Sequence, residues 1–385
     1  DKRDKTNTVT NPLKEINPTK DVTVQVGGDS IDGKSVYLNH TFLYRLDSSI
    51  LPPDRAYQTV TDWGGTDQLN TEYDQYLGNW AVYASRDLYR DGQMLAARGE
   101  KIAGSGFDSS KFGGNLFTVD ADDNGKVTAD ATQAYLDLVS ADNEHEAGWV
   151  LYLQCKRIAV ADEVPNTWTE TINGQPRESN KVVTKTPDMT PSIHLEKVDT
   201  PTLKQEGQEQ ADRDDPKQAL KMDADSIGIT FIITNTSKTD PATGDGAWYK
   251  ASDLNLADST IVGDAHVDMD SLTYPDNWDT LVLKPGESVS VTGTLKGVKE
   301  GETHTDRAIV TGTPLVECAP SNGDPFNDKT DGGEDTDPEY STGDVTEIDG
   351  KQLCADTQTT SNTDDWNGYR AKPLASTGVA VLGLA

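Results

Sequence analysis

Cysteine, basic residues and long apolar runs are all scarce in this sequence of 385 residues. The three cysteines are too few for a disulfide-framework scaffold, and neither a Cys-x-x-Cys pair nor a Cys/His cluster with zinc spacing occurs. No apolar run approaches the ~20 residues that a transmembrane helix needs. The 34 lysines and arginines stand against 65 acidic residues, and the resulting formal charge of −31 repels phosphate backbones and anionic lipids. Nucleic acid and an inner-leaflet membrane surface are therefore not expected partners.

Catalytic motifs are also missing. The five histidines are scattered, and His145-Glu146 lacks the second histidine of a metalloprotease helix. No Ser/His/Asp set and no phosphate-binding loop stands out. The sequence therefore predicts a protein without turnover chemistry and without a small-molecule cofactor.

What the sequence does contain is alternation of apolar and polar residues with a period of two, which is typical of strands. Val22, Val24 and Val26 alternate in this way, and residues 149–155 (WVLYLQC) place Trp149 and Leu151 on one face. One stretch, 129–139, favours a short helix. We expect a mainly β architecture with minor helix.

A break marked by Pro187 and Pro191, in the segment TPDMTP (186–191), separates two strand-rich halves. An Asn-led run is followed by a proline and then a lysine at 7–20, and again at 180–197, as at a domain end followed by a domain start. The predicted organisation is as follows: 1–11, the last strand of a missing upstream domain; 12–190, a first β-sandwich; 191–355, a second β-sandwich with an acidic insertion at 319–353; and 356–385, a disordered linker with a sorting signal.

Lys20 and Asn180 stand in the first and last predicted strands of the first sandwich, so the fold can bring them side by side. A lysine buried among apolar groups tends to lose its charge, and a neutral amine can attack an asparagine carbonyl that a nearby acid polarises. The product is an isopeptide bond. We choose Asp62 as the acid and Asp47 as the second choice. The alternative is that these residues are only surface charges and an Asn cap.

The segments 17–47, YQTVTDWGG and RESNKVVTKTP resemble the C-terminal adhesin domains of the streptococcal antigen I/II family. The resemblance covers about residues 12–190, and Pro18-Thr19-Lys20 and Ser179-Asn180 are its most specific pieces. It implies a β-sandwich with a self-formed Lys–Asn bond on a Gram-positive surface adhesin. Lys20, Asn180 and Asp62 then match the lysine, the asparagine and the acid.

The second half resembles the collagen-adhesin-type, immunoglobulin-like sandwiches of actinobacterial surfaces, in the segments GITFIITNTS, LVLKPGESVSVTGTL and HTDRAIVTG. This resemblance implies that Lys197 is the bonding lysine and Asp258 the catalytic acid. Asp306 occupies the place of the usual acceptor asparagine. A Lys–Asp amide and an ordinary ion pair both remain open.

Leu374-Ala375-Ser376-Thr377-Gly378, followed by VAVLGLA, resembles a Leu-Ala-x-Thr-Gly sortase signal. The resemblance implies cleavage between Thr377 and Gly378 and covalent attachment to the cell wall. Sortase is then an expected partner.

Asp120, Asp122 and Asn124 match the first half of a calcium loop, but position 12 of the loop is Ala131 where the glutamate should be. The alternative is a hairpin turn at Asn124-Gly125. Calcium is thus the one candidate cofactor.

Cys318 and Cys354 bracket the acidic segment, and in an exported protein they are expected to form a disulfide. Cys155 is expected to be a buried free thiol.

Together these features predict tandem β-sandwiches from a wall-anchored surface adhesin that binds host or bacterial surface glycoproteins. Two alternatives remain: a structural stalk for an upstream binding head, and accessory modules of a secreted carbohydrate-active enzyme.

Overall fold

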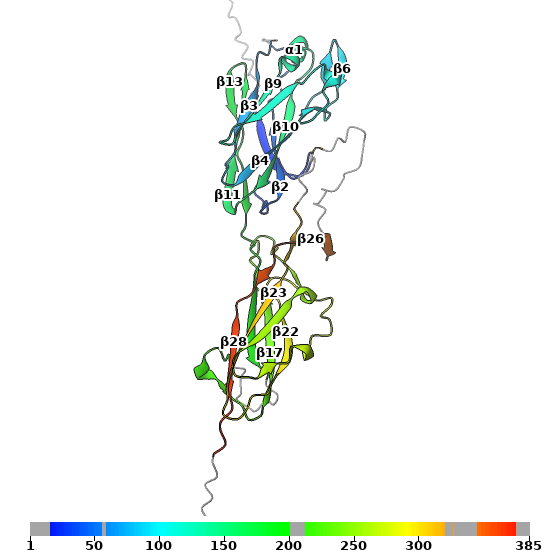
Figure 1. Ribbon diagram of the computed structural model, residues 1–385. Helices are drawn as coiled ribbons and strands as arrows, with labels where there is room; N and C mark the ends of the chain where they lie inside the picture. The colour runs from blue at the N-terminus through cyan, green and yellow to red at the C-terminus, as the bar shows by residue number, and fades with distance from the viewer. Residues whose placement is uncertain (1–15, 56–58, 201–211, 320–325, 327–344, 375–385) are drawn as a thin grey trace, which may run out of the picture. The chain divides into compact units, whose positions relative to one another are not determined.

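The computed structural model describes residues 16–55, 59–200, 212–319, 326 and 345–374 (Figure 1). The chain divides into two compact units, the first formed by residues 1–187 with 319–342 and the second by 188–318 with 343–385. Both are built mainly from strands, as the alternation predicts. Among the described residues, no helix has the length and apolar character needed to cross a membrane.

The first unit is a sandwich of two five-stranded sheets. In spatial order the first sheet consists of β1 (Thr19–Thr23), β2 (Thr41–Asp47), β10 (Trp149–Arg157), β4 (Asp74–Ala84) and β7 (Lys101–Gly104). The second consists of β13 (Gln175–Glu178), β12 (Trp168–Ile172), β3 (Trp63–Gln68), β9 (Lys126–Ala131) and β8 (Phe117–Ala121). Two smaller sheets pair β11 (Ala161–Asn166) with β14 (Val182–Thr186) and β5 (Leu88–Arg90) with β6 (Gln93–Ala96).

One core fills the space between the two large sheets. Trp149 from the first sheet packs against Trp63 and Trp168 from the second, at ring-centroid distances of 6.1 and 5.8 Å. All three side chains are buried. These large rings tie the sheets together, since each buries on the order of 150–250 Å² of surface.

The helix of this unit begins later than the sequence predicts. Helix α1 spans Gln133–Ala141, and the first residues of the predicted stretch continue strand β9. The reason is alternation: Val127 and Ala129 are buried on the strand, and the helical spacing of buried residues begins only at Tyr135. A 3₁₀ turn at Ser110–Phe112 is the other helical element of the unit among its described residues.

The second unit is also a sandwich (Figure 1). One sheet consists of β15 (Ile193–Asp199), β17 (Ser226–Asn235), β22 (Ser288–Lys296) and β20 (His266–Val267). The other consists of β16 (Leu220–Lys221), β28 (Asp364–Tyr369), β23 (Thr303–Gly312) and β19 (Asn255–Val262), with β27 (Thr359–Thr360) on β23. Short sheets pair β18 (Tyr249–Lys250) with β21 (Val282–Leu283), and β24 (Leu315–Glu317) with β26 (Lys351–Ala355) and β25 (Val345–Ile348). Short 3₁₀ turns lie at Pro216–Gln218, Ala251–Asp253 and Met269–Ser271.

Two predicted boundaries need correction. The segment 356–385 is not a linker throughout, because β28 completes a sheet of the second unit and places Trp366 fully inside its core. The acidic insertion also ends earlier than residue 353, since β25 and β26 pair there. The many charged and polar residues around β25, β26 and β28 explain why these three strands were not predicted from the sequence. Residues 1–11 lie outside the described residues.

Candidate crosslinking sites

Lys20 points into the sandwich of the first unit. On β1 it pairs with Leu46 of β2, and alternation places it on the same inward face as the buried Val22. Its ammonium nitrogen lies 4.5 Å from the ring centroid of Tyr44. Burial lowers the pKa of Lys20 below its ordinary value, because the charged form loses its water. The structure thus gives this lysine the environment that amide chemistry requires.

The partner of the Lys20 ammonium is Asp67 on β3. Because β3 belongs to the opposite sheet, this ion pair bridges the two layers of the sandwich. The Asp67 side chain is buried, and burial raises the pKa of its carboxyl while the Lys20 charge opposes the shift. The burial effects on Lys20 and Asp67 both favour the neutral forms, a protonated acid beside an uncharged amine.

Asn166, the last residue of β11, brings an amide to the same buried carboxylate. Its hydrogen bond is among the effects that hold down the pKa of Asp67. Asn166 is only 5% exposed, and its Oδ1 has no hydrogen-bond partner within the described part of the chain. Leaving a buried carbonyl oxygen without a partner costs free energy, so this oxygen calls for a physical explanation.

The structure does not place the predicted asparagine, Asn180, or the predicted acid, Asp62, at the Lys20 ammonium. Asn180 meets the main chain of Lys20, accepting from its N–H at 2.8 Å and donating to its C=O at 2.9 Å. Asp62 is exposed and accepts a hydrogen bond from Gly174 N. Asp47, the second choice for the acid, accepts hydrogen bonds from Nε and Nη2 of Arg45, at 2.8 Å each. The acid beside the Lys20 ammonium is therefore Asp67 and not Asp62 or Asp47, and the amide near that acid is Asn166, whereas the Asn180 side chain bonds the main chain of Lys20.

The second unit contains a related arrangement. Lys197 on β15 is fully buried, and its ammonium contacts the carboxylates of Asp258 on β19 and Asp306 on β23. β15 lies in one sheet, while β19 and β23 are neighbours in the other, where Asp306 pairs with Thr260 and Asp258 with Ala308. The three residues named from the sequence are thus brought together, again across the two layers.

Electrostatics distinguish the two carboxylates. Burial raises the pKa of Asp258 to about 6, the Lys197 charge counteracts this, and the negative charge of Asp306 raises it further. The neighbouring negative charge makes ionisation of Asp258 costlier than it is for an isolated carboxyl. His304 is also buried, with Nε2 3.2 Å from Asp306 Oδ2. His304 was not predicted from the sequence to belong to this cluster.

A sequence signal for Asp67 and Asn166 did exist. In WGGTDQ the inward positions of β3 are Trp63, Gly65 and Asp67, and in ADEVPN Asn166 follows the buried Val164 at a spacing of two. Continuing the alternation through these polar residues would have indicated that they point inward.

The predicted calcium loop is a hairpin turn between β8 and β9. Asp122 Oδ1 accepts from the backbone N–H groups of Asn124 and Lys126, both at 2.9 Å, and Gly125 has a φ of 83°. Nowhere in the described ranges do three or more His, Cys, Asp or Glu residues gather as metal ligands would. The arrangement around Asp120 and Asp122 therefore gives calcium no support.

Cysteine positions match the expectations. Cys318 and Cys354 form a disulfide bond, and Cys155 is a buried free thiol. The disulfide closes a loop around the acidic segment.

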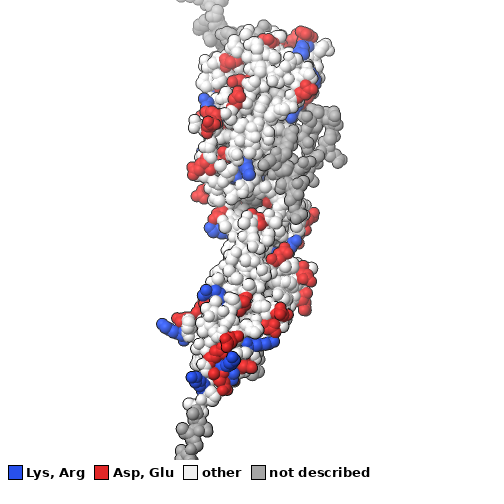
Figure 2. All heavy atoms as spheres, in the orientation of Figure 1, with Lys and Arg blue, Asp and Glu red and all other residues white. Residues whose placement is uncertain are grey.

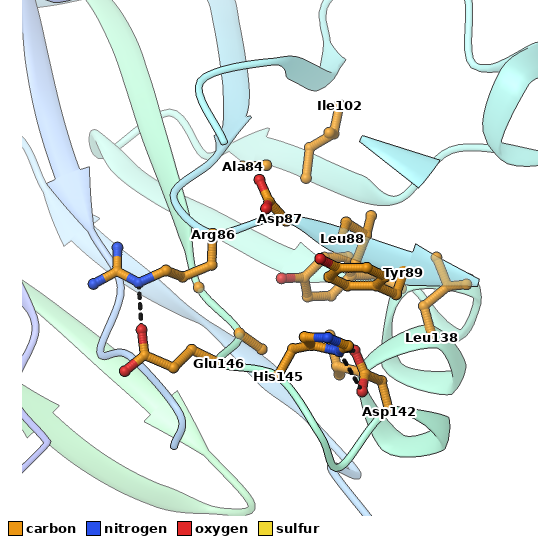
Figure 3. Close-up of a pocket in the computed structure, with 14 residues that line it drawn as sticks. Ala84, Arg86, Asp87, Leu88, Tyr89, Ile102, Leu138, Asp142, His145 and Glu146 are labelled. Carbon is orange, nitrogen blue, oxygen red and sulfur yellow. Dashed lines mark hydrogen bonds and ion pairs between the residues drawn. The ribbon is translucent and has the colours of Figure 1, made fainter. Parts of the chain in front are cut away.

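A pocket beside α1 is filled by its own side chains (Figure 3). The His145 ring stacks on Tyr89 with centroids 3.8 Å apart, and its Nδ1 lies 3.0 Å from Asp142 Oδ2. Arg86 donates to Glu146 at 2.6 Å. The remaining volume is about 10 Å³, at the lower limit for a single water, so no ligand fits.

Residues 17–187, most of the first unit, match the family described as "Cell surface antigen C-terminus". The chain is 35% identical over 189 residues to the aggregation substance of Enterococcus faecalis, an alignment that spans 48% of this chain and 14% of that protein. Among solved structures, it is similar to the C-terminal domain of the Streptococcus pyogenes antigen I/II-family protein AspA. The identity is 27% and the TM-score 0.38, over 45% of this chain and 47% of that one. The Actinomyces fimbrial adhesin FimA is 11% identical with a TM-score of 0.29, over 80% and 93% of the two chains.

These matches support a cell-surface antigen domain of adhesin type in the first unit, in agreement with the resemblance found in its motifs.

Proposed function

We propose that this chain is part of a wall-anchored bacterial surface adhesin whose two sandwiches crosslink themselves by internal amide bonds. The observation that carries the proposal is the buried lysine of each unit, which reaches from the first sheet to a carboxylate of the second. A buried ion pair by itself is weak evidence for stability, because its desolvation cost offsets the attraction. Each unit, however, has such an ion pair close to a side chain that could acylate the lysine, Asn166 in the first and Asp306 in the second. We therefore favour the formation of an amide bond.

In the first unit, the neutral Nζ of Lys20 attacks Cγ of Asn166. The new C–N bond forms as the bond from Cγ to the amide nitrogen breaks, and one ammonia leaves. Asp67 accepts the proton that the amine loses and donates one to the departing nitrogen. Its raised pKa and its contact with both partners suit that role.

In the second unit, Lys197 and Asp306 condense with loss of one water. Asp258, whose pKa is raised to about 6, takes a proton from the amine and passes it to the departing oxygen. Ammonium and carboxylate together contain all the atoms of the amide and the water, so no co-reactant is required.

Such a bond benefits a protein that holds cells to surfaces. The Lys20–Asn166 bond joins β1 to β11, so tension on the first strand loads a covalent link before it loads strand hydrogen bonds. In the chain-entropy model, a loop this long stabilises the unit by roughly 5 kcal/mol.

The partner class that fits this role is a glycoprotein on a host or bacterial surface. The whole chain should bind to surfaces coated with glycoprotein and not to the same surfaces after enzymatic removal of their glycans. Equal, negligible binding to both would overturn the adhesive role and leave a structural stalk.

Anchoring is proposed from Leu374, Thr377 and Gly378. Leu374 is 97% exposed, so a sortase can reach the first residue of the signal. Thr377 and Gly378 lie outside the described residues. Incubation of the parent protein with an actinobacterial sortase should cut after Thr377, and Thr377→Ala should abolish the cut. Cleavage that persists in Thr377→Ala would contradict the assignment.

A further inference from the structure

The first sheet of the first unit carries a groove on its outer side, distinct from the crosslinking site within the sandwich. Its volume is about 520 Å³, within the range of small-ligand pockets. Thr19, Asp47, Tyr83, Val150 and Tyr152, from the neighbouring strands β1, β2, β4 and β10, line it. It therefore lies across the face of a sheet.

The charge of the lining is the reverse of that of the molecule. Three arginines, Arg45, Arg86 and Arg98, meet there with a single acidic residue, Asp47. Acidic residues outnumber basic ones by 65 to 34 over the chain, and the face in Figure 2 shows red groups scattered over both units. A concentration of arginine in such a background selects anions at short range.

The three arginines are held to different degrees. Arg45 is held by Asp47 through two hydrogen bonds, which neutralise the one acid of the lining. Arg86 is paired with Glu146 and also donates to Ser85 O. Within the described part of the chain, the Arg98 guanidinium enters no ion pair, although its backbone N–H donates to Asp87. Arg98 is thus the cation available to a ligand.

The floor of the groove is formed by packed aromatic rings. The rings of Tyr83 and Tyr152 meet edge to face at 5.7 Å, and Phe326 packs against the same apolar cluster. Tyr152 also accepts a hydrogen bond from Gly27 N through its hydroxyl oxygen. Ser85 Oγ, which lines the groove, has no hydrogen-bond partner in the described residues. A hydroxyl-rich ligand could satisfy it.

From this combination we infer that the groove binds an anionic saccharide, with the carboxylate or sulfate of the sugar on Arg98. Arginine presents planar paired donors that match either group. An extended acidic peptide fits less well, because β2, β4 and β10 each pair with neighbours on both edges, and on the edge strand β1 the main chain of Lys20 is already bonded by Asn180. A compact ring ligand needs no main-chain ladder.

The inference rests on the proposed adhesive function and names the ligand class of that function. It does not depend on the amide bonds. Intact mass reports the amide bonds, adhesion to glycoprotein reports the adhesive role, and saccharide binding reports the groove. Adhesion without saccharide binding would overturn the groove alone.

The test is a calorimetric or NMR titration of the whole chain with 3′-sialyllactose, lactose 3′-sulfate and unmodified lactose. One or both charged sugars should bind and lactose should not, and the stronger of the two identifies the preferred anion. Arg98→Gln should weaken binding by roughly tenfold, the loss of one charge-assisted contact. Arg86→Gln should also weaken it.

Arg177→Gln is the matched control, because Arg177 lies on β13 of the other sheet and should leave the affinity unchanged. Equal binding of lactose, or full affinity in Arg98→Gln, would overturn the assignment. So would binding of a polyglutamate peptide with none of either charged sugar, which would make the groove a site for acidic polypeptide.

Discussion

The carboxamide of Asn180 spans the main chain of Lys20, with Oδ1 2.8 Å from its N and Nδ2 2.9 Å from its O. Asn362 makes the same two contacts with Leu195 in the second unit, at 2.9 Å each. In both units an asparagine before a late strand thus completes the ladder of the first strand. Both polar atoms of the Asn180 amide are thus engaged with the main chain of Lys20, and we propose that Asn180 positions Lys20 while Asn166 supplies the acyl group.

The first prediction separates the two asparagines. The Lys20–Asn166 bond should remove one ammonia from the mass of the wild-type protein, in addition to the two hydrogens lost in the disulfide and the water lost in the second unit. Lys20→Ala, Asn166→Ala and Asp67→Ala should each keep the other losses and lack the loss of ammonia. Intact-mass spectrometry measures this, and peptide mapping identifies the joined residues.

Asn180→Ala is the control, and it should keep the bond while β1 becomes less firmly held. If Asn180→Ala lacks the loss of ammonia while Asn166→Ala still shows it, then Asn180 and not Asn166 supplies the acyl group.

The second prediction concerns the leaving group in the second unit. Lys197 and Asp306 should lose one water, whereas Asp306→Asn should lose one ammonia, because the acyl group is then an amide. Asp258→Asn should slow or abolish the reaction, since the neutral amide cannot transfer the proton. The whole chain is allowed to fold and react and is then digested. High-resolution mass spectrometry of the fragment that contains Lys197 and residue 306 distinguishes the loss of water from the loss of ammonia.

Lys197→Met is the control that must show neither loss. If Asp306→Asn and wild type both retain their full masses, Lys197 is part of an ion-pair cluster and nothing more.

Sequence reasoning found the architecture and the lysines because both depend on local patterns. Alternation identifies β1 and places Lys20 on its inward face whatever the partner strands are. The partners of Lys20 depend on which strand of the opposite sheet lies across from it. Alternation from Trp63 places Asp67 on the inward face of β3, but only the packing of the two sheets decides which inward acid lies at the Lys20 ammonium.

The second unit shows the complementary case. A resemblance in motif supplied Lys197, Asp258 and Asp306 together, and the structure brings them into contact. His304 was missed because its burial follows from the pairing of β23 with β28, and β28 itself lies in a charged segment that was taken for a linker. Trp366 was the signal there, since a tryptophan at alternating spacing favours a core strand.

The third prediction concerns the disulfide. Cys318 and Cys354 are 36 residues apart, and closing such a loop stabilises the folded state by about 3–4 kcal/mol in the chain-entropy model. The double variant Cys318→Ser/Cys354→Ser should therefore melt lower. Differential scanning calorimetry should show this shift in one transition and leave the other in place, because the bond belongs to the second unit.

Wild-type protein in reductant is the matched control, since Cys155 is a free thiol and the same single bond is lost. A melting temperature that falls in the double variant and not in reduced wild type would assign the effect to the serines.

The fourth prediction is a pH dependence in the second unit. Asp212, Asp214 and Asp364 converge there, and the pKa of Asp214 rises to about 7, mainly by burial and then by hydrogen bonding to and repulsion from the other two carboxyls. The folded state keeps a proton that the unfolded state releases near pH 4, so the free energy of unfolding falls as pH rises from about 4 to about 7.

Asp214→Asn retains a neutral hydrogen-bond donor at every pH. Because Asp214 is exposed, solvent screens much of this effect, so the variant should melt as wild type does at pH 4 and higher by about 1–2 °C at pH 8.

Asp223→Asn is the control, because Asp223 belongs to the same unit and is not among the groups that shift the pKa of Asp214. It should show no such difference between the two pH values. A melting temperature of Asp214→Asn that stays below that of wild type at pH 8 would mean that the Asp214 carboxylate stabilises the fold, the opposite of what its crowded position requires.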